Sequence, residues 1–356
     1  MFQTDINKQT ILIEGVTFSP GDISVALHSS KNYSDFHLEL FRFLQNWFDA
    51  SEVMIIHTSG STGKPKSMMV QKKFMMQSAC ITCDYFGLKP LDKILLCMPL
   101  SFIAGKMMVV RALVAGLDIY PMSPTGHPLK KTSLDFKFAS MVPLQIFNSL
   151  QKPAETKRLQ DTGVLLIGGG VINPALEEAL KDFPNPVYAS YGMAETVSHI
   201  ALRRINGSTA SLNFTPLPSV KLTLSEEGTL VIEAPLVCER LLYTNDTAEL
   251  YSDGTFRILG RKDNVINTGG LKIQTETLEA TLSTFIHVPF AVSSQPDAKF
   301  GEIIVLAVEQ AIDETQLAVH LPAYQIPKKV VVLQAIPRTE SGKIDRITLK
   351  RVLQNA

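Results

Sequence analysis

The chain has 356 residues, of which 45% are hydrophobic and 19% charged, a composition typical of a globular protein with room for two domains. Its 34 basic and 34 acidic side chains cancel, so no net field favours non-specific binding to nucleic acid or to a membrane surface. The N-terminus shows no basic flank followed by an apolar run, and the longest mostly apolar stretch, residues 94–104, is too short to span a bilayer. We therefore expect a cytoplasmic protein with no nucleic-acid partner and no membrane insertion; its oligomeric state stays unknown.

Short apolar runs alternate with helix-like segments from residue 53 to residue 191. We expect strands within residues 52–60, 92–100, 117–122, 136–143 and 164–170, and helices within residues 72–87, 105–116, 144–150 and 173–182. Strands that alternate with helices favour a parallel sheet covered by helices on both faces. Ligands bind beyond the carboxyl ends of such strands, where the sequence places HTSG, MPLSF and GGG.

The pattern changes after about residue 206. Residues 219–235 and 249–260 each predict an antiparallel hairpin, with Glu-Glu-Gly and Ser-Asp-Gly turns. The remainder predicts a helix at 274–284 and strands near 290–293 and 303–308. The expected fold class is α/β (α+β), with a large N-terminal domain at 1–262 that includes a β subdomain at about 207–260, and a small C-terminal α+β domain at 263–356.

The stretch HTSGSTGKPKS, His57–Ser67, has the composition of a phosphate-binding loop. It departs from the P-loop pattern, because Thr58 stands at the first glycine position and Pro65 follows Gly63-Lys64 where Ser or Thr is required. The proline also restricts the preceding lysine to extended geometry. The loop therefore offers hydroxyls, glycine N–H groups and lysines on a different scaffold.

Five stretches resemble the adenylate-forming enzymes, the superfamily of acyl- and aryl-CoA synthetases, luciferases and peptide-synthetase adenylation domains. In order they are Thr58–Lys66, Tyr191–Thr196, Asp246 with the Asp253-Gly254 turn, Gly260–Asp263 and Pro337–Arg346. The resemblance covers nearly the whole chain except the first fifty residues. It implies an enzyme in which a carboxylate attacks the α-phosphate of ATP, and in which a thiol then displaces AMP from the acyl-adenylate. The implied cofactors and co-substrates are ATP, Mg²⁺ and coenzyme A.

The resemblance also assigns roles to the residues that match. The serine-threonine loop would hold the departing pyrophosphate, Tyr191 would stack on adenine, and Asp246 would bind the ribose hydroxyls with support from Arg261. The implied ATP- and AMP-binding set is Thr58, Ser59, Gly60, Ser61, Thr62, Gly63, Lys64, Lys66, Gly168, Gly169, Gly170, Ser190, Tyr191, Gly192, Asp246 and Arg261. Glu195 would hold magnesium, Thr196 would contact phosphate, and Lys343 would be the catalytic lysine that bridges the attacking carboxylate and the α-phosphate.

Asp263 matches the hinge residue of the superfamily, which implies a mobile C-terminal domain. That domain would present Lys343 for the first step and Asn267–Lys272 for the second. Gly269, Gly270 and Lys272 would then lie along the thiol arm of coenzyme A. An ordinary turn at the two glycines is an alternative that the residues leave open.

The acid-binding region departs from many relatives, because Ser101-Phe102 replaces an aromatic-histidine pair. Residues 99–116 and 191–207 resemble most the o-succinylbenzoate–CoA ligases of menaquinone synthesis. We expect Phe102 to wall the acyl pocket, and we hypothesise that Lys106 and His199 bind a second carboxylate or a ketone. Another acyl-CoA or carrier-protein-loading ligase and a non-catalytic nucleotide-binding relative are the alternatives.

Four cysteines, Cys80, Cys83, Cys97 and Cys238, predict no disulfide framework at this length. Cys80 and Cys83 form a C-x-x-C pair, but no second pair or histidine follows at metal-ligand spacing. The pair also falls late in an expected helix, whereas redox pairs lie at helix N-termini. We expect buried thiols on one helix face.

Overall fold

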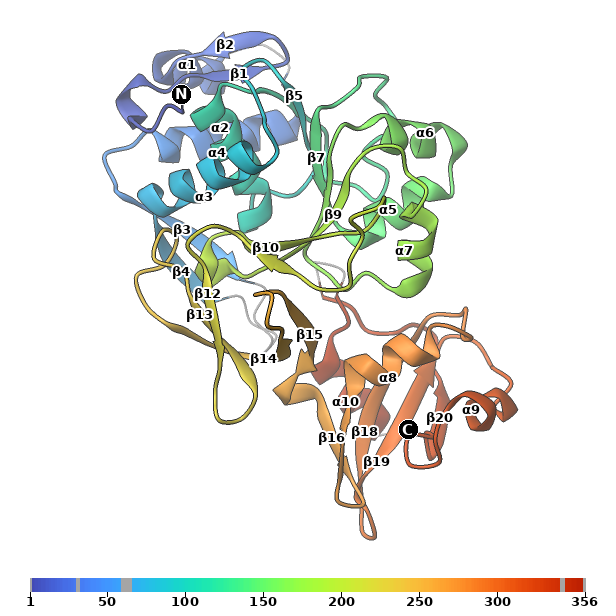
Figure 1. The fold of residues 1–356 in the computed structure, drawn as a ribbon. Coiled ribbons are helices and arrows are strands. Elements are labelled where there is room, and N and C mark those ends of the chain that lie inside the picture. The colour runs from blue at the N-terminus through green and yellow to red at the C-terminus, as the bar shows by residue number, and fades with distance from the viewer. Residues whose placement is uncertain (1, 30–32, 59–65, 340–342, 355–356) are drawn as a thin grey trace.

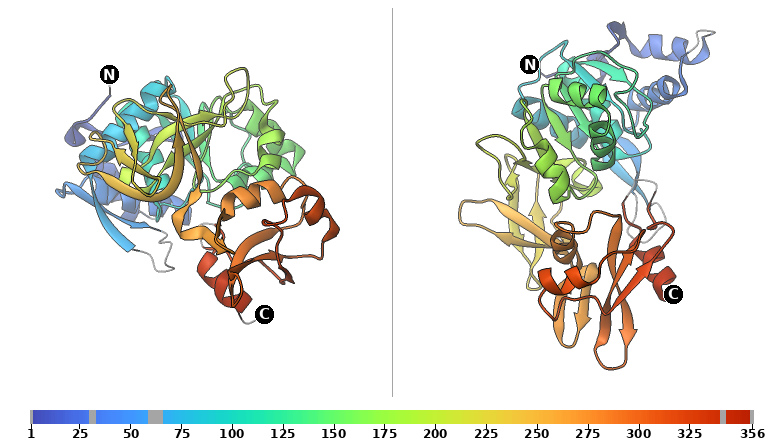
Figure 2. Two further views of the ribbon diagram at one scale, coloured as in Figure 1. Left: turned by 60° about the horizontal axis from the view of Figure 1, so that its bottom comes forward. Right: turned by 90° about the vertical axis from the view of Figure 1, so that its right-hand side faces the viewer.

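The computed structural model describes residues 2–29, 33–58, 66–339 and 343–354. Within these residues the strands form sheets of nine, four, five and two strands. Figure 1 and Figure 2 show the nine-stranded sheet and its helices as the largest layer, with the segment that follows β15 gathered in a smaller lobe at the other end of the molecule. Three short 3₁₀ turns are η1 (Ile6–Lys8), η2 (Ala194–Thr196) and η3 (Lys262–Asn264).

The largest sheet has the strand order β11-β10-β9-β8-β7-β5-β6-β1-β2. Neighbours from β9 through to β1 are parallel, and the strands beyond them at both ends are antiparallel. This arrangement confirms the expected α/β sheet. The strands are β1 (Ile11–Ile13), β2 (Val16–Phe18), β5 (Lys93–Leu96), β6 (Asp118–Pro121), β7 (Phe138–Met141), β8 (Leu165–Ile167), β9 (Val187–Gly192), β10 (His199–Arg204) and β11 (Thr215–Pro216).

Helices cover both faces of this sheet, so each central strand contributes to two hydrophobic cores. In β5, Ile94 and Leu96 belong to the core that includes α2, α3 and α4, whereas Leu95 belongs to the core that includes α5 and α7. Strands buried on both faces need apolar residues at every position, which explains their continuous apolar runs. The helices are α1 (Pro20–His28), α2 (Asp35–Trp47), α3 (Lys72–Tyr85), α4 (Ile103–Ala115), α5 (Pro143–Leu150), α6 (Pro153–Asp161) and α7 (Pro174–Leu180).

Helix α4 is the central helix of the first core. Its residues from Met107 to Ala115 are all buried, and a helix that is apolar on every side belongs in a protein interior. It ends at Gly116, which adopts a left-handed conformation with φ 64° that favours glycine. No helix in the described part of the chain is both long enough and apolar enough to cross a membrane.

The strand predicted before the phosphate loop forms, but it does not join the parallel sheet. β3 (Val53–Thr58) pairs antiparallel with β4 (Lys66–Gln71) in the two-stranded sheet. A parallel neighbour requires a crossover of a dozen or more residues, and the loop between β3 and β4 is shorter than that. The expectation of a strand-loop-helix order is therefore corrected to a β-hairpin that precedes α3.

The four-stranded sheet contains β12 (Lys221–Leu224), β13 (Thr229–Glu233), β14 (Leu242–Leu250) and β15 (Phe256–Arg261). Both predicted hairpins are confirmed, because β12 pairs with β13 and β14 pairs with β15. The turn glycines Gly228 and Gly254 have φ of 73° and 82°, a region that side chains disfavour.

The five-stranded sheet lies in the C-terminal lobe. Its strands are β16 (Val265–Thr268), β17 (Leu271–Gln274), β18 (Phe290–Asp297), β19 (Gly301–Val308) and β20 (Lys329–Val332), accompanied by α8 (Thr275–Leu282), α9 (Thr315–His320) and α10 (Arg346–Gln354). In β19, Ile304 and Leu306 pack in a core with α8, whereas Val305 and Ala307 pack with α10. The lobe therefore has hydrophobic cores of its own on both faces of its sheet.

Candidate active site

Three predicted nucleotide-binding residues meet between β9 and the four-stranded sheet. The Tyr191 hydroxyl donates a hydrogen bond to Asp246 Oδ2 at 2.7 Å, and Arg261 Nη1 donates to Asp246 Oδ1 at 3.2 Å. The register of β14 and β15 places Asp246 directly opposite Arg261. Burial and the Asp246 carboxylate raise the pKa of Tyr191 far above its usual value, so its hydroxyl remains a donor. A carboxylate held in this way presents oxygens that can accept hydrogen bonds from a diol.

Arg261 connects this carboxylate to the predicted hinge residue. Arg261 Nη2 lies 3.1 Å from Asp263 Oδ2, and the Asn245 amide donates to both Asp263 oxygens at 3.2 and 3.0 Å. Asp263 lies in η3, between the last strand of the four-stranded sheet and the first strand of the C-terminal lobe. The same guanidinium therefore contacts the Asp246 carboxylate and the segment that joins the two parts of the molecule.

The predicted catalytic lysine comes from the C-terminal lobe to this cluster. A hydrogen bond from Thr339 N to Lys343 O, 2.8 Å long, fixes the backbone of Lys343 beside Thr339. Lys343 is exposed to solvent, but enough protein surrounds its ammonium group for burial to lower its pKa. The charge of Arg261 lowers this pKa further, and Asp246 opposes the shift. The charges of Lys343, Arg261 and Asp246 therefore lie close together, although Lys343 is far from the other two in sequence.

The Tyr191–Thr196 motif forms a tight turn. A Cβ atom on Gly192 would lie 2.3 Å from Ser198 O, so this position requires glycine. Glu195 is exposed in η2, where its carboxylate is accessible. Thr196 is fully buried, and its Oγ1 accepts a hydrogen bond from Met193 N at 3.0 Å and donates to Ser198 O at 2.7 Å. Its hydroxyl therefore holds the turn together in this arrangement, and its contact with phosphate stays a prediction.

The predicted adenine wall lies at the carboxyl end of β8. Ser190 Oγ donates to Ile167 O at 3.1 Å, and a Cβ atom on Gly168 would lie 2.6 Å from that Oγ. Gly169 has φ 76°, and Gly170 follows it beside Pro143. The three glycines thus lie at the edge of the parallel sheet where ligands bind, next to the strand that carries Tyr191.

The phosphate loop is only partly within the described residues. Thr58 and Lys66 are paired residues of β3 and β4, which brings the two ends of the loop together. The remaining predicted residues, Ser59, Gly60, Ser61, Thr62, Gly63 and Lys64, lie outside the described residues. Their role with pyrophosphate stays a prediction.

Two of the predicted acid-binding residues begin helix α4. Phe102 is the N-terminal capping residue of this helix and is half-buried. Lys106 lies in its first turn, with Nζ 5.4 Å from the centre of the Phe43 ring of α2. Burial lowers the pKa of Lys106, and the Glu39 carboxylate opposes this shift. Lys106 therefore faces α2 in this structure.

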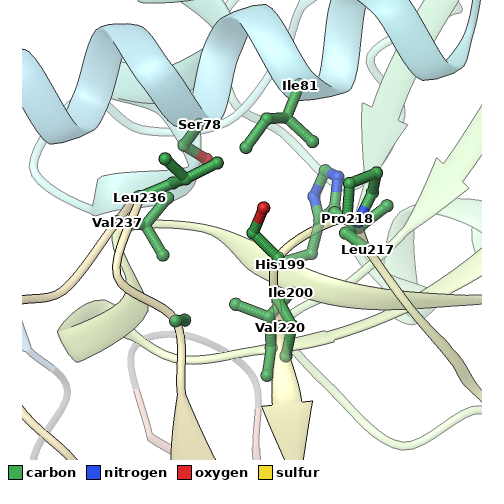
Figure 3. A pocket seen from close by; sticks show the side chains of 11 residues that line it. Ser78, Ile81, His199, Ile200, Leu217, Pro218, Val220, Leu236 and Val237 are labelled. Carbon is green, nitrogen blue, oxygen red and sulfur yellow. The ribbon is translucent and has the colours of Figure 1, made fainter. Parts of the chain in front are cut away.

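His199 is the first residue of β10 and contacts α3 rather than α2. Its Nε2 is 3.3 Å from Thr82 Oγ1 of α3, and its Nδ1 is 3.3 Å from Ser198 Oγ. Figure 3 shows His199 at the edge of a small cavity of about 10 Å³, room for about one water molecule, between Ile81 and Leu217. Burial and the charge of Arg111 lower the pKa of His199 to about 3, so the ring is neutral at pH 7. The structure thus does not bring His199 together with Lys106.

Arg111 is a candidate residue that the sequence reasoning missed. It is 2% exposed, its Nη2 donates to Ser198 Oγ at 2.9 Å, and its Nη1 contacts Met108 Sδ at 3.6 Å. Within the described residues, its Nε has no hydrogen-bond partner and no carboxylate forms an ion pair with it. Burial lowers its pKa to about 10, so it stays charged at pH 7. The sequence does contain one indication of this residue, because Arg111 is the only charged residue in the run MMVVRALVAG.

The residues predicted to contact coenzyme A are not near this cluster. Gly269 and Gly270, with φ 57° and 82°, form the two-residue turn between β16 and β17, and Lys272 pairs with Asn267 beside it. Two left-handed residues are what a short hairpin turn requires. Figure 1 shows β16 running away from the nine-stranded sheet, so this turn lies at the far end of the C-terminal lobe. Their contact with coenzyme A stays a prediction.

Among the described residues, no group of three or more His, Cys, Asp or Glu side chains has a metal-binding arrangement. Cys83 and Cys97 are buried and Cys80 is half-buried, and burial raises the pKa of Cys80 to about 11 and the pKa of Cys83 and Cys97 to about 12. All four cysteines are free thiols. The raised pKa keeps the thiols of Cys80, Cys83 and Cys97 protonated and unreactive at pH 7. The expectation of buried thiols on one helix face holds for Cys83, whereas Cys80 is half-buried.

Known proteins are similar to this chain in sequence and in fold. A 2-succinylbenzoate–CoA ligase of Listeria monocytogenes is 26% identical over 338 residues, which cover 86% of this chain and 71% of the relative. The crystal structure of an acyl-CoA synthetase (AMP-forming)/AMP-acid ligase II-like protein of Dyadobacter fermentans is 32% identical, with a TM-score of 0.62 over 93% of this chain and 98% of that one.

The o-succinylbenzoate coenzyme A synthetase (MenE) of Bacillus subtilis, solved in complex with ATP and magnesium ion, has a TM-score of 0.70. It is 23% identical and covers 83% of this chain and 69% of its own, a likeness that concerns the fold. The sequence profile described as AMP-binding enzyme matches residues 11–234, which is more than half of the chain. The chain therefore belongs to the AMP-binding enzyme family, and the resemblance predicted from its motifs is confirmed.

Proposed function

We propose that this protein is an AMP-forming ligase that activates a carboxylic acid with ATP and transfers the acyl group to coenzyme A. The preferred acid is o-succinylbenzoate, an aromatic acid that carries a second carboxylate and a ketone. The Listeria relative is named for this substrate. We further propose that the protein acts in the cytoplasm and takes part in menaquinone synthesis, the pathway that the resemblance implies.

One observation carries the proposed activity: Lys343, from the C-terminal lobe, lies close enough to Asp246 and Arg261 for their charges to shift its pKa. The reaction joins two anions, and unit charges 4 Å apart repel by about 4 kcal/mol at an effective dielectric constant near 20. Cations held in place before the reaction offset this repulsion as charge develops. Lys343 is the group that would contact both the attacking carboxylate and the α-phosphate, while Asp246 binds the ribose.

The exposed Glu195 carboxylate suits the magnesium ion that accompanies ATP. Mg²⁺ prefers oxygen ligands and keeps several of its waters, so one or two protein carboxylates together with the phosphates of the substrate are sufficient to hold it. The absence of a larger carboxylate cluster within the described residues is compatible with this arrangement. The ion would neutralise phosphate charge, and Glu195 would fix its position.

The choice of a dicarboxylic acid rests on Arg111. A buried guanidinium without a carboxylate partner costs several kcal/mol of desolvation, which a bound anion can offset. Its Nη2 donates a hydrogen bond to Ser198 Oγ, two residues after the motif that carries Glu195, so it lies beside the expected acyl pocket. We assign to Arg111 the second carboxylate of the substrate, in place of the Lys106 and His199 pair expected from the sequence.

The thiol step requires another arrangement of the C-terminal lobe. The Gly269-Gly270 turn is remote from Asp246 in this structure, and a rotation about Asp263 would exchange it for the Lys343 turn. We therefore propose that the lobe, residues 263–356, moves between two positions in each turnover. The Arg261–Asp263 ion pair lies at the position where such a rotation would take place.

The test measures acid-dependent exchange of labelled pyrophosphate into ATP, with o-succinylbenzoate, benzoate and a fatty acid as substrates. We expect exchange with o-succinylbenzoate well above that with benzoate, and the acyl-CoA product when coenzyme A is added. Exchange with all three acids at equal rates would contradict the substrate assignment. No exchange with any acid would contradict the ligase function itself.

A further inference from the structure

Helix α2 contacts the segment that leads into the acid-binding helix. Glu39 Oε1 of α2 accepts a hydrogen bond from Leu100 N at 3.1 Å. Leu100 is itself buried, and it lies two residues before Phe102, the predicted wall of the acyl pocket. A side chain from the N-terminal region, which carries none of the motifs, is therefore bonded to the backbone of the pocket segment, residues 98–102.

The pocket segment is packed closely against α4. A Cβ atom on Gly105 would lie 2.4 Å from Pro99 O and 2.7 Å from Met98 O, so the helix and the segment touch through their backbones. Phe102 N donates to Pro99 O at 3.3 Å, and Lys106 N donates to Phe102 O at 3.3 Å. A shift of the segment would therefore move Phe102 and the start of α4 together.

Glu39 also acts on the first turn of α4 through its charge. The Lys106 ammonium lies over the Phe43 ring, one helical turn after Glu39 on α2. Burial disfavours the charged form of Lys106, and the Glu39 carboxylate restores part of its stability. The same carboxylate thus bonds to the backbone of the pocket segment and, through its charge, favours the charged form of Lys106 in the first turn of α4.

We propose that Glu39 is a positioning residue for the acid: it fixes the pocket segment through Leu100, so that Phe102 forms the wall against which the aromatic acid binds. This role rests on the proposed function. Among the described residues, Glu39 bonds to Leu100 N and acts on the charge of Lys106, and it forms no hydrogen bond with a predicted nucleotide-binding residue. Its removal should therefore weaken acid binding and leave nucleotide binding unchanged.

The test compares Glu39→Ala and Glu39→Gln, with Gln45→Ala as the matched control at an exposed position on the same helix. Glutamine keeps an oxygen that can accept from Leu100 N, whereas alanine removes it. We expect Glu39→Ala to raise the KM for o-succinylbenzoate by about tenfold in the pyrophosphate exchange assay, in line with one lost hydrogen bond to a charged group. The KM for ATP should change less than twofold, and Gln45→Ala should stay near the parent value. Glu39→Gln keeps the acceptor for Leu100 N but loses the charge that acts on Lys106, so it should raise the KM for the acid by less than Glu39→Ala does.

Hydrogen–deuterium exchange on the unliganded protein gives a second readout that does not depend on activity. We expect faster exchange of the amides of residues 98–102 in Glu39→Ala and no change in Glu39→Gln. Equal increases in both KM values, or an unchanged exchange rate in this segment, would overturn the positioning role. If the parent protein activates no acid, the proposed function fails and this role fails with it, even where the exchange pattern is as expected.

Discussion

The nucleotide side and the acid side of the candidate site differ in how their charges are balanced. On the nucleotide side, Arg261 pairs with both Asp246 and Asp263, and Tyr191 completes the hydrogen bonding of Asp246. On the acid side, Arg111 is almost fully buried beside a neutral His199, and within the described residues no carboxylate forms an ion pair with it. The first cluster is complete without a ligand, whereas the second lacks an anion. A bound nucleotide would therefore replace some of the existing hydrogen-bond partners of Asp246. A bound acid would instead supply the negative charge that Arg111 lacks among the described residues.

The largest expected effect tests the nucleotide side. Lys343→Ala should lower the rate of acyl-adenylate formation by about 10²–10³-fold, or roughly 3–4 kcal/mol, because the cation that stabilises the developing phosphate charge is lost. Thioester formation from pre-made acyl-adenylate should continue at nearly the parent rate. Single-turnover measurements of the two half-reactions separate these steps.

The exposed Lys350 on α10 provides a control for that variant. Its Nζ lies 3.4 Å from Glu302, and Lys350→Ala removes a lysine from the same region without affecting the cluster at Asp246. Both half-reactions should stay within twofold of the parent protein in this control. An equal loss of both half-reactions in Lys343→Ala would show that the lysine supports the fold rather than the first step.

The acid side is tested by Arg111→Met, which removes the buried charge and keeps most of the side-chain volume. We expect the KM for o-succinylbenzoate to rise by about 10–100-fold, since a hydrogen bond to a charged group contributes about 1.5–3 kcal/mol. The KM for ATP should not change. Because an unpaired buried charge disfavours folding, the free energy of unfolding should stay constant or increase.

Arg111→Lys is the matched control, because it keeps the charge and loses the planar pair of donors. Its KM for the acid should lie between those of the parent protein and Arg111→Met. Denaturant unfolding measured beside the kinetics distinguishes the two possible roles of the residue. A marked loss of stability in Arg111→Met, with an unchanged KM, would assign Arg111 to the fold alone.

The contrast between the two sides also explains what the sequence could predict. Tyr191, Asp246 and Arg261 lie in short contiguous motifs, so the sequence alone indicated their chemistry, and the fold brings them into contact. The two hairpins of the four-stranded sheet and the helices α3, α4, α5, α7 and α8 followed from periodicity and turn residues, whereas no range was predicted for the other described helices. In β3, periodicity predicted the strand but not its partner, because pairing depends on the loop that follows.

Arg111 and Glu39 could not be assigned from the sequence, for different physical reasons. Arg111 is a single charged residue in an apolar helix, and only its burial without a carboxylate shows that it is unusual. Glu39 meets Leu100 across a long separation in sequence, through a hydrogen bond to the backbone that leaves no pattern of side chains. His199 was noticed for its place beside a motif, but burial makes it neutral, which sequence position alone does not reveal.

The smallest expected effect is a change in the pH dependence of the free energy of unfolding, caused by His199. It tests whether this ring is neutral beside Arg111. The folded protein holds the pKa of His199 at about 3, whereas the usual value of 6.5 applies in the unfolded chain. Between these values the unfolded chain binds a proton that the folded protein does not, so the free energy of unfolding falls as the pH drops below 6.5. One such group contributes about 1.4 kcal/mol per pH unit once the pH is well below 6.5.

His199→Gln should remove this contribution and flatten the pH dependence of the free energy of unfolding between pH 6 and pH 4.5. Glutamine can still bond to Thr82 and Ser198, and His287→Gln, at an exposed position, is the matched control. Denaturant titrations at several pH values measure the slope directly. If the slope in His199→Gln equals that of the parent protein, the pKa of the ring in the folded protein lies near the unfolded value of 6.5, and below that pH Arg111 would face a second cation. In that pH range the electrostatic case for an anion at Arg111 would become stronger, and the description of His199 as a neutral neighbour of Arg111 would be abandoned.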